Sequence, residues 1–80
     1  MEVEFTMPRL GSEMTKGIIV EWLKKEGDQV NEGDSICLVD TEKAVLEVEA
    51  EVTGVLIKIL VDEKSEAEVG VTIAMLETEN

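Results

Sequence analysis

The sequence predicts an all-β domain, a sandwich or barrel built from two similar units of about four strands each. Three observations support this prediction. Short segments rich in β-branched residues alternate with frequent turns, no window has the helical periodicity of apolar residues, and the second half of the chain repeats the first. The 80 residues make one small domain, in which most segments have to contribute to the core.

The repeat has a constant shift of 37 residues and contains no gap. An ungapped match that aligns turn glycines with turn glycines indicates two similar units related by a pseudo-twofold axis. Because Lys43 aligns with Asn80, the axis should place the two residues at opposite ends of the domain. The seven identities among 27 aligned positions are Gly17–Gly54, Leu23–Leu60, Glu26–Glu63, Gly33–Gly70, Ile36–Ile73, Thr41–Thr78 and Glu42–Glu79.

Alternating apolar residues define the strands of the first half. Residues 2–7 form the first strand, which ends at Pro8, and residues 8–16 form a loop that the repeat does not match. Gly17 opens the next strand, and Trp22 on it is expected in the core because it aligns with the apolar Ile59. The remaining strands are expected at 29–30, 35–40 and 45–50, separated by Gly-containing or polar turns, and the repeat transfers this pattern to the second half.

The stretch Asp40-Thr41-Glu42-Lys43-Ala44 joins two of these strands. Two strands with a short polar connection predict a β-hairpin, with Lys43 at its exposed tip. The acidic residues nearby (Asp40, Glu42, Glu47 and Glu49) suit a charged, solvated lysine. A catalytic lysine is instead buried or crowded by cations, so this lysine is expected to be chemically quiet.

Composition excludes several classes of function. The net charge of −12 disfavours binding to nucleic acid or to anionic membranes and favours basic protein partners. No apolar run is long enough to span a membrane, and the acidic N-terminus has no targeting signal, so a cytosolic type of protein is expected. With no His or Tyr there is no catalytic triad or zinc site, and the single Cys37 is expected to be a buried apolar residue.

The chain resembles, over essentially its whole length, the lipoyl domain of the dihydrolipoyl acyltransferase component of 2-oxo acid dehydrogenase complexes. The matching features are Met7-Pro8 with Gly11, Gly17-Ile18-Ile19 before Trp22, the turns Glu26-Gly27-Asp28 and Glu32-Gly33-Asp34, and Asp40-Thr41-Glu42-Lys43-Ala44. The resemblance implies a flattened β-barrel or sandwich of two four-stranded antiparallel sheets with pseudo-twofold symmetry. It also implies that lipoate is attached covalently to Lys43.

The same resemblance implies a carrier domain that is a substrate and not an enzyme. Its lipoyl-lysine would act as a swinging arm that shuttles acyl groups and reducing equivalents between a 2-oxo acid decarboxylase, the acyltransferase core and dihydrolipoyl dehydrogenase. A lipoate–protein ligase or a lipoyl/octanoyl transferase would modify Lys43. The resemblance assigns recognition by that enzyme to Asp40, Glu42 and Ala44, although the family usually has Asp where this chain has Glu42.

The loop before Gly17 is the part of the family that helps the decarboxylase select its own lipoyl domain. The resemblance therefore assigns partner recognition to Leu10, Gly11, Ser12, Glu13 and Met14. Without it, the loop would be read as a surface connection with one apolar residue tucked in.

Other functions stay open on the sequence alone. A biotin carboxyl carrier domain shares the fold, but its lysine typically has Met on both sides, where this chain has Glu42 and Ala44; the glycine-cleavage carrier is a longer chain. An unmodified acidic interaction domain or a fragment of a larger enzyme are the remaining alternatives.

We expect residues 1–80 to form one lipoyl-like domain, monomeric in isolation, either alone or as the N-terminal part of a longer chain. Its expected location is the prokaryotic cytoplasm, or the mitochondrial matrix if it is part of a eukaryotic precursor.

Overall fold

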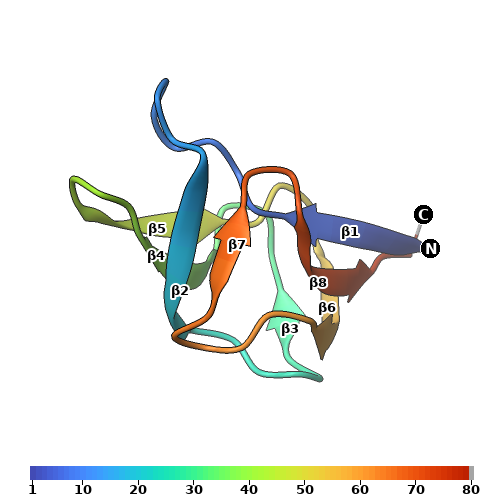
Figure 1. Ribbon diagram of the computed structural model, residues 1–80. Helices are drawn as coiled ribbons and strands as arrows, with labels where there is room; N and C mark the ends of the chain where they lie inside the picture. The colour runs from blue at the N-terminus through green and yellow to red at the C-terminus, as the bar shows by residue number, and fades with distance from the viewer. Residues whose placement is uncertain (80) are drawn as a thin grey trace.

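The computed structural model describes residues 1–79 and consists of two four-stranded antiparallel sheets (Figure 1). One sheet has the strand order β1-β8-β6-β3 and the other has β5-β4-β2-β7, which confirms the predicted all-β fold. No helix in this part of the chain is long and apolar enough to cross a membrane. The strands are β1 (Glu2–Thr6), β2 (Lys16–Trp22), β3 (Gln29–Val30), β4 (Ser35–Asp40), β5 (Val45–Glu49), β6 (Gly54–Ile59), β7 (Glu66–Glu68) and β8 (Thr72–Glu77).

The pseudo-twofold symmetry extends to the register of the strands. Strands β2, β3 and β4 correspond to β6, β7 and β8, and the two remaining edge strands, β5 and β1, correspond to each other. Ile19 lies opposite Val39 in the ladder between β2 and β4, and Leu56 lies opposite Leu76 in the ladder between β6 and β8. Both ladders then have a bulge, at positions 20 and 57. The sequence repeat is therefore a repeat of structure.

Each bulged strand is held by a carboxylate from the other half of the chain. The Trp22 amide donates a hydrogen bond of 2.9 Å to Glu63 Oε2, and the Ile59 amide donates one of 2.8 Å to Glu26 Oε2. Hydrogen bonds to an ionised acceptor are stronger than neutral ones. This reciprocal pair explains why glutamate occurs at both positions of the repeat.

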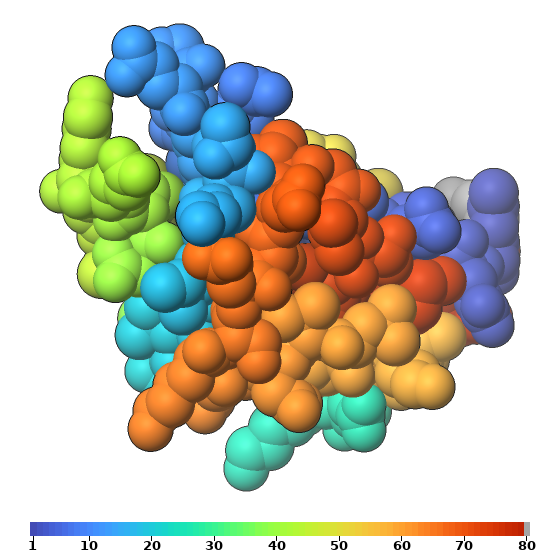
Figure 2. All heavy atoms as spheres, in the orientation of Figure 1, coloured from blue at the N-terminus to red at the C-terminus, as the bar shows by residue number. Residues whose placement is uncertain are grey.

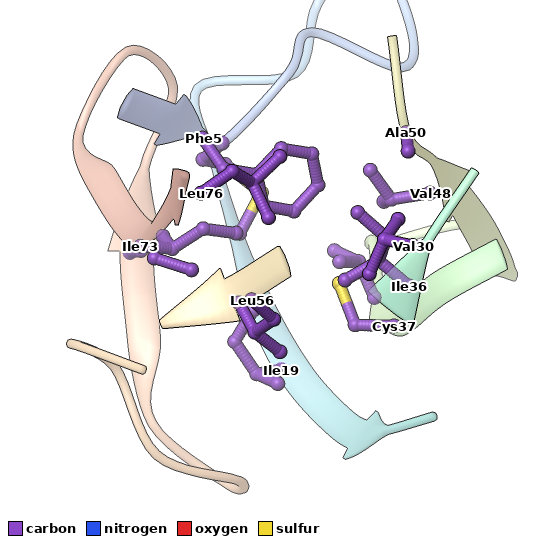
Figure 3. Packing of buried hydrophobic residues seen from close by; sticks show 14 residues of the cluster. Phe5, Ile19, Val30, Ile36, Cys37, Val48, Ala50, Leu56, Ile73 and Leu76 are labelled. Atoms are coloured by element: carbon purple, nitrogen blue, oxygen red, sulfur yellow. The ribbon is translucent and has the colours of Figure 1, made fainter. Parts of the chain in front are cut away.

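The core lies between the two sheets (Figure 3). Cys37 is fully buried there, and burial raises the pKa of its thiol to about 12, so it is a packed thiol at neutral pH, as predicted. Trp22 departs from the prediction: it is only half-buried at the edge of the core, where its indole N–H donates to the Val61 carbonyl over 2.9 Å. Side chains with full burial include Met7, Ile19, Ile36, Val39, Leu56, Ile73 and Leu76.

The hairpin tip and the N-terminal strand end lie at opposite ends of an elongated body of 35 × 21 × 18 Å (Figure 1). At one end the connection between β4 and β5 turns back on itself. At the other end the Thr78 amide donates a hydrogen bond of 2.8 Å to the Met1 carbonyl. Asn80, the repeat partner of Lys43, lies outside the described residues.

Two equivalent glycines allow strands to approach closely, and they differ in what a side chain would meet. A Cβ at Gly54 would overlap the backbone carbonyl of Glu77, whereas a Cβ at Gly17 would meet the side chains of Val39 and Met14. Gly54→Ala should lower the free energy of unfolding by about 3 kcal/mol and Gly17→Ala by about 1 kcal/mol, because side chains yield more easily than backbone. Urea unfolding followed by the fluorescence of Trp22 measures both. Equal losses would contradict this assignment.

Lys64 has a left-handed backbone conformation, with φ of 71°, at the position equivalent to Gly27, whose φ is 95°. A side chain in this conformation clashes with the following carbonyl, and glycine does not. We expect Lys64→Gly to raise the free energy of unfolding by about 1 kcal/mol. Gly27→Ala should lower it. Thermal unfolding checks both, and a destabilised Lys64→Gly variant would refute the explanation.

Candidate functional site

The tip of the β4–β5 hairpin consists of Glu42 and Lys43. The Thr41 amide donates a hydrogen bond of 2.9 Å to the Ala44 carbonyl, which closes the hairpin directly below the tip. Glu42, Lys43 and Ala44 are exposed and Thr41 is half-buried. The predicted position of Lys43 is therefore correct.

The loop between β1 and β2 is organised around Met14. The Met14 amide donates to the Gly11 carbonyl over 3.1 Å, and the Leu10 amide lies 3.1 Å from Met14 Sδ. Leu10 and Met14 are half-buried and pack against the core, whereas Gly11, Ser12 and Glu13 are exposed. The loop is thus anchored by two apolar side chains and presents a small polar surface between them.

A groove of about 650 Å³ separates this loop from the hairpin tip. Figure 2 shows the hollow between the loop in blue and the hairpin in yellow-green. Every site residue predicted from the sequence lines it, so two segments separated in the chain by the three strands β2, β3 and β4 form one surface. The lining residues are Leu10 to Ile18, Asp40 to Ala44, Leu46 and Glu66.

Seven lining residues were not predicted as part of the site: Thr15, Lys16, Gly17, Ile18, Thr41, Leu46 and Glu66. Lys16 and Glu66 form an ion pair of 3.3 Å. Glu66 comes from β7, which pairs with β2, and no local motif indicates that pairing. The alternation of its strand predicts that Leu46 lies on the apolar face, but Leu46 is 37% exposed and lines the groove.

Of the four carboxylates expected near Lys43, Asp40 and Glu42 line the groove with it, and Glu47 and Glu49 do not. Glu47 accepts a hydrogen bond of 2.6 Å from the Ser35 hydroxyl, at the start of β4 and therefore away from the tip. The acidic residues that share the groove with Lys43 are Glu13, Asp40, Glu42 and Glu66. Sequence proximity to Lys43 therefore identified only some of the acidic residues beside it. Strand β5 leads away from the tip, whereas the β1–β2 loop and β7 bring Glu13 and Glu66 to the groove.

The site contains an exposed primary amine, that of Lys43. Within residues 1–79 Lys43 forms no ion pair, and no cluster of His, Cys, Asp and Glu could hold a metal ion. An exposed primary amine on a two-residue tip is accessible for acylation by another enzyme. The groove beside it, which includes Leu10, Met14, Ile18 and Leu46, offers apolar surface to a group attached there. The site thus fits a covalently attached acyl cofactor.

Comparison with known protein families supports this interpretation. Residues 3–76 match the biotin/lipoyl family model, described as a biotin-requiring enzyme. The chain is 47% identical over 78 residues to the chloroplastic dihydrolipoyllysine-residue acetyltransferase component 5 of the pyruvate dehydrogenase complex of Arabidopsis thaliana. It is 41% identical over 75 residues to the mitochondrial pyruvate dehydrogenase protein X component of Mus musculus. These matches cover 96% and 92% of this chain but only 17% and 15% of the relatives.

Solved structures share the fold. The lipoyl domain of the 2-oxoglutarate dehydrogenase complex from Azotobacter vinelandii superposes with a TM-score of 0.77 at 27% identity, covering 98% of this chain and 99% of that one. A multi-domain long-chain acyl-CoA carboxylase has the same TM-score at 16% identity, covering 99% of this chain and 7% of that one, which shows the fold alone. The chain therefore belongs to the biotin/lipoyl family, and it is a lipoyl domain, which is a carrier domain.

Proposed function

We propose that Lys43 is the residue that carries lipoate in this domain. Lipoyl domains carry lipoate covalently on a lysine, and the observation that selects Lys43 is its place on the exposed two-residue tip of the hairpin. The modifying enzyme would join Lys43 Nζ to the lipoate carboxyl as an amide. Asp40, Glu42 and Ala44, which surround the lysine on the tip and line the same groove, are proposed as its recognition residues.

In the carrier role, the protein would present the modified Lys43 to its partner enzymes and orient it. The bound cofactor supplies a disulfide that can accept an acyl group together with two electrons. Lys43 provides a long, flexible attachment at one end of the body, and the other end of the described chain lies about a molecular length away (Figure 1). A domain held by that far end would leave its tip free to reach successive partners.

The proposed partners are the components of a 2-oxo acid dehydrogenase complex. A lipoate–protein ligase or a lipoyl/octanoyl transferase would modify the domain, and the decarboxylase, the acyltransferase core and dihydrolipoyl dehydrogenase would act on the lipoyl group. Leu10, Gly11, Ser12, Glu13 and Met14 form the other wall of the groove, which supports the proposal that the decarboxylase recognises this loop and the tip together.

The parent chain is proposed to be a dihydrolipoyllysine-residue acyltransferase. This proposal is supported by relatives of which the match covers only 15–17%. The relatives include bacterial, chloroplast and mitochondrial proteins. We propose the bacterial cytoplasm or the mitochondrial matrix as the location.

The first prediction of this proposal concerns modification. Incubation with lipoate, ATP and a lipoate–protein ligase should add one lipoyl group, detected by intact mass, and Lys43→Arg should abolish the addition. Lys58→Arg, on the exposed side of β6, is the matched control and should still be modified. Attachment of biotin by a biotin ligase, with no lipoylation, would instead indicate a carboxylase carrier, and failure of both would favour an unmodified interaction domain.

The second prediction concerns the loop. In the lipoylated domain, Glu13→Lys should lower kcat/KM for reductive acylation by the decarboxylase about tenfold, equivalent to about 1.4 kcal/mol, because it reverses a charge on the groove. Glu32→Lys, in the exposed turn before β4, makes the same charge change at the far end of the hairpin and should have little effect. Equal losses in both variants would show that net charge, and not the loop, determines recognition.

A further inference from the structure

The hydroxyl of Thr41 organises the turn on which Lys43 stands. It donates a hydrogen bond of 2.9 Å to the Ala44 carbonyl. It also lies 3.2 Å from the Ala44 amide and 3.4 Å from the Lys43 amide, in position to accept from both. One side-chain oxygen therefore contacts the backbone on both sides of the lysine, in the manner of a Ser/Thr turn.

The pseudo-twofold symmetry provides an internal comparison, because Thr78 is the equivalent threonine at the other end of the body. The Thr78 amide and hydroxyl both point to the Met1 carbonyl, at 2.8 and 3.3 Å, as those of Thr41 point to the Ala44 carbonyl. The next contact differs. The Met1 amine donates to the backbone carbonyl of Thr78 over 2.8 Å, whereas the equivalent Ala44 amide faces the Thr41 hydroxyl.

A threonine thus occurs at the ends of both β4 and β8. Its contact with the carbonyl of the neighbouring strand pair is explained by the need to close that pair. At the hairpin the Thr41 hydroxyl also contacts the amides of Lys43 and Ala44. At 3.2 and 3.4 Å these contacts are longer than the usual 2.9–3.0 Å of a backbone hydrogen bond, and they act together with the 2.9 Å bond from the same hydroxyl to the Ala44 carbonyl. Their effect is to restrict the conformations of an otherwise exposed turn.

We propose that Thr41 is a positioning residue for the modification of Lys43: its hydroxyl holds the turn in the conformation that the lipoate-attaching enzyme binds. The proposal rests on the assignment of Lys43 as the attachment site. An enzyme that selects one conformation binds a flexible turn with an affinity reduced by the fraction of molecules in that conformation. Loss of the hydroxyl should therefore raise KM for the domain and leave kcat unchanged.

The test compares Thr41→Val, which removes the hydroxyl at nearly constant volume, with Thr78→Val, which makes the same change at the equivalent position. Lipoylation of each purified domain by a lipoate–protein ligase, with lipoate and ATP, is followed by intact mass over a range of domain concentrations. Thr41→Val should raise KM about tenfold with unchanged kcat, corresponding to a competent turn populated about a tenth of the time. Thr78→Val should match the unsubstituted domain, and Thr41→Ser, which retains the hydroxyl, should restore KM.

A second measurement on the unmodified domains does not depend on the enzyme. Backbone NMR couplings and amide exchange at Glu42, Lys43 and Ala44 should show a more mobile turn in Thr41→Val and an unchanged turn in Thr78→Val. An unchanged turn in Thr41→Val, an unaltered KM, failure of Thr41→Ser to restore it, or the same increase in Thr78→Val would each overturn the positioning role. No lipoylation of the unsubstituted domain would overturn the proposed function itself, and with it the role of Thr41.

Discussion

The antiparallel pairing of β2 with β7 and of β6 with β3 exchanges one short strand between the two halves of the chain. Each four-stranded sheet therefore contains strands from both halves, and neither half can complete its sheet alone. The glutamates at 26 and 63 strengthen the same exchange, since each binds a backbone amide of the opposite half. A chain of this size has few residues to spare for loops, and the exchange builds two layers and one core from strands of two to seven residues.

The symmetry also makes the two ends of the described body comparable. The strand pairs β4–β5 and β8–β1 are equivalent, and each is closed by a threonine. In the first pair the chain continues across the closure through Glu42 and Lys43, whereas in the second Thr78 lies against the N-terminal Met1. A lysine at the continuous closure projects from a rigid pair of strands, far from the other closure. The strands thus fix the position of the lysine backbone, and the long side chain extends the amine away from the domain.

The groove beside Lys43 arises where the symmetry breaks. The loop between β1 and β2 is much longer than its counterpart between β5 and β6, and Leu10 and Met14 anchor it to the core. Gly17 is the space-saving element of this arrangement, because a side chain there would contact both Met14 and Val39. The β1–β2 loop thus departs from the pseudo-twofold symmetry, while the strands around it follow the repeat. The hairpin tip and this loop form the two walls of one groove.

The sequence by itself determined the strands, the repeat, the hairpin and the exposed position of Lys43, because these depend on local alternation, turn residues and a constant spacing. Strand pairing over 40 or more residues was decided only by the tertiary structure. It brought Glu66 of β7 to the groove, directed Glu63 to the backbone of Trp22, and moved Trp22 itself to the edge of the core. Contacts within the β4–β5 hairpin were also seen only in the structure: Glu47 accepts from the Ser35 hydroxyl, and the Thr41 hydroxyl lies against the amides of Lys43 and Ala44. The long-range partners depend on which strands pair and in which register, and the local ones depend on side-chain conformation, and the periodicity of the sequence specifies neither.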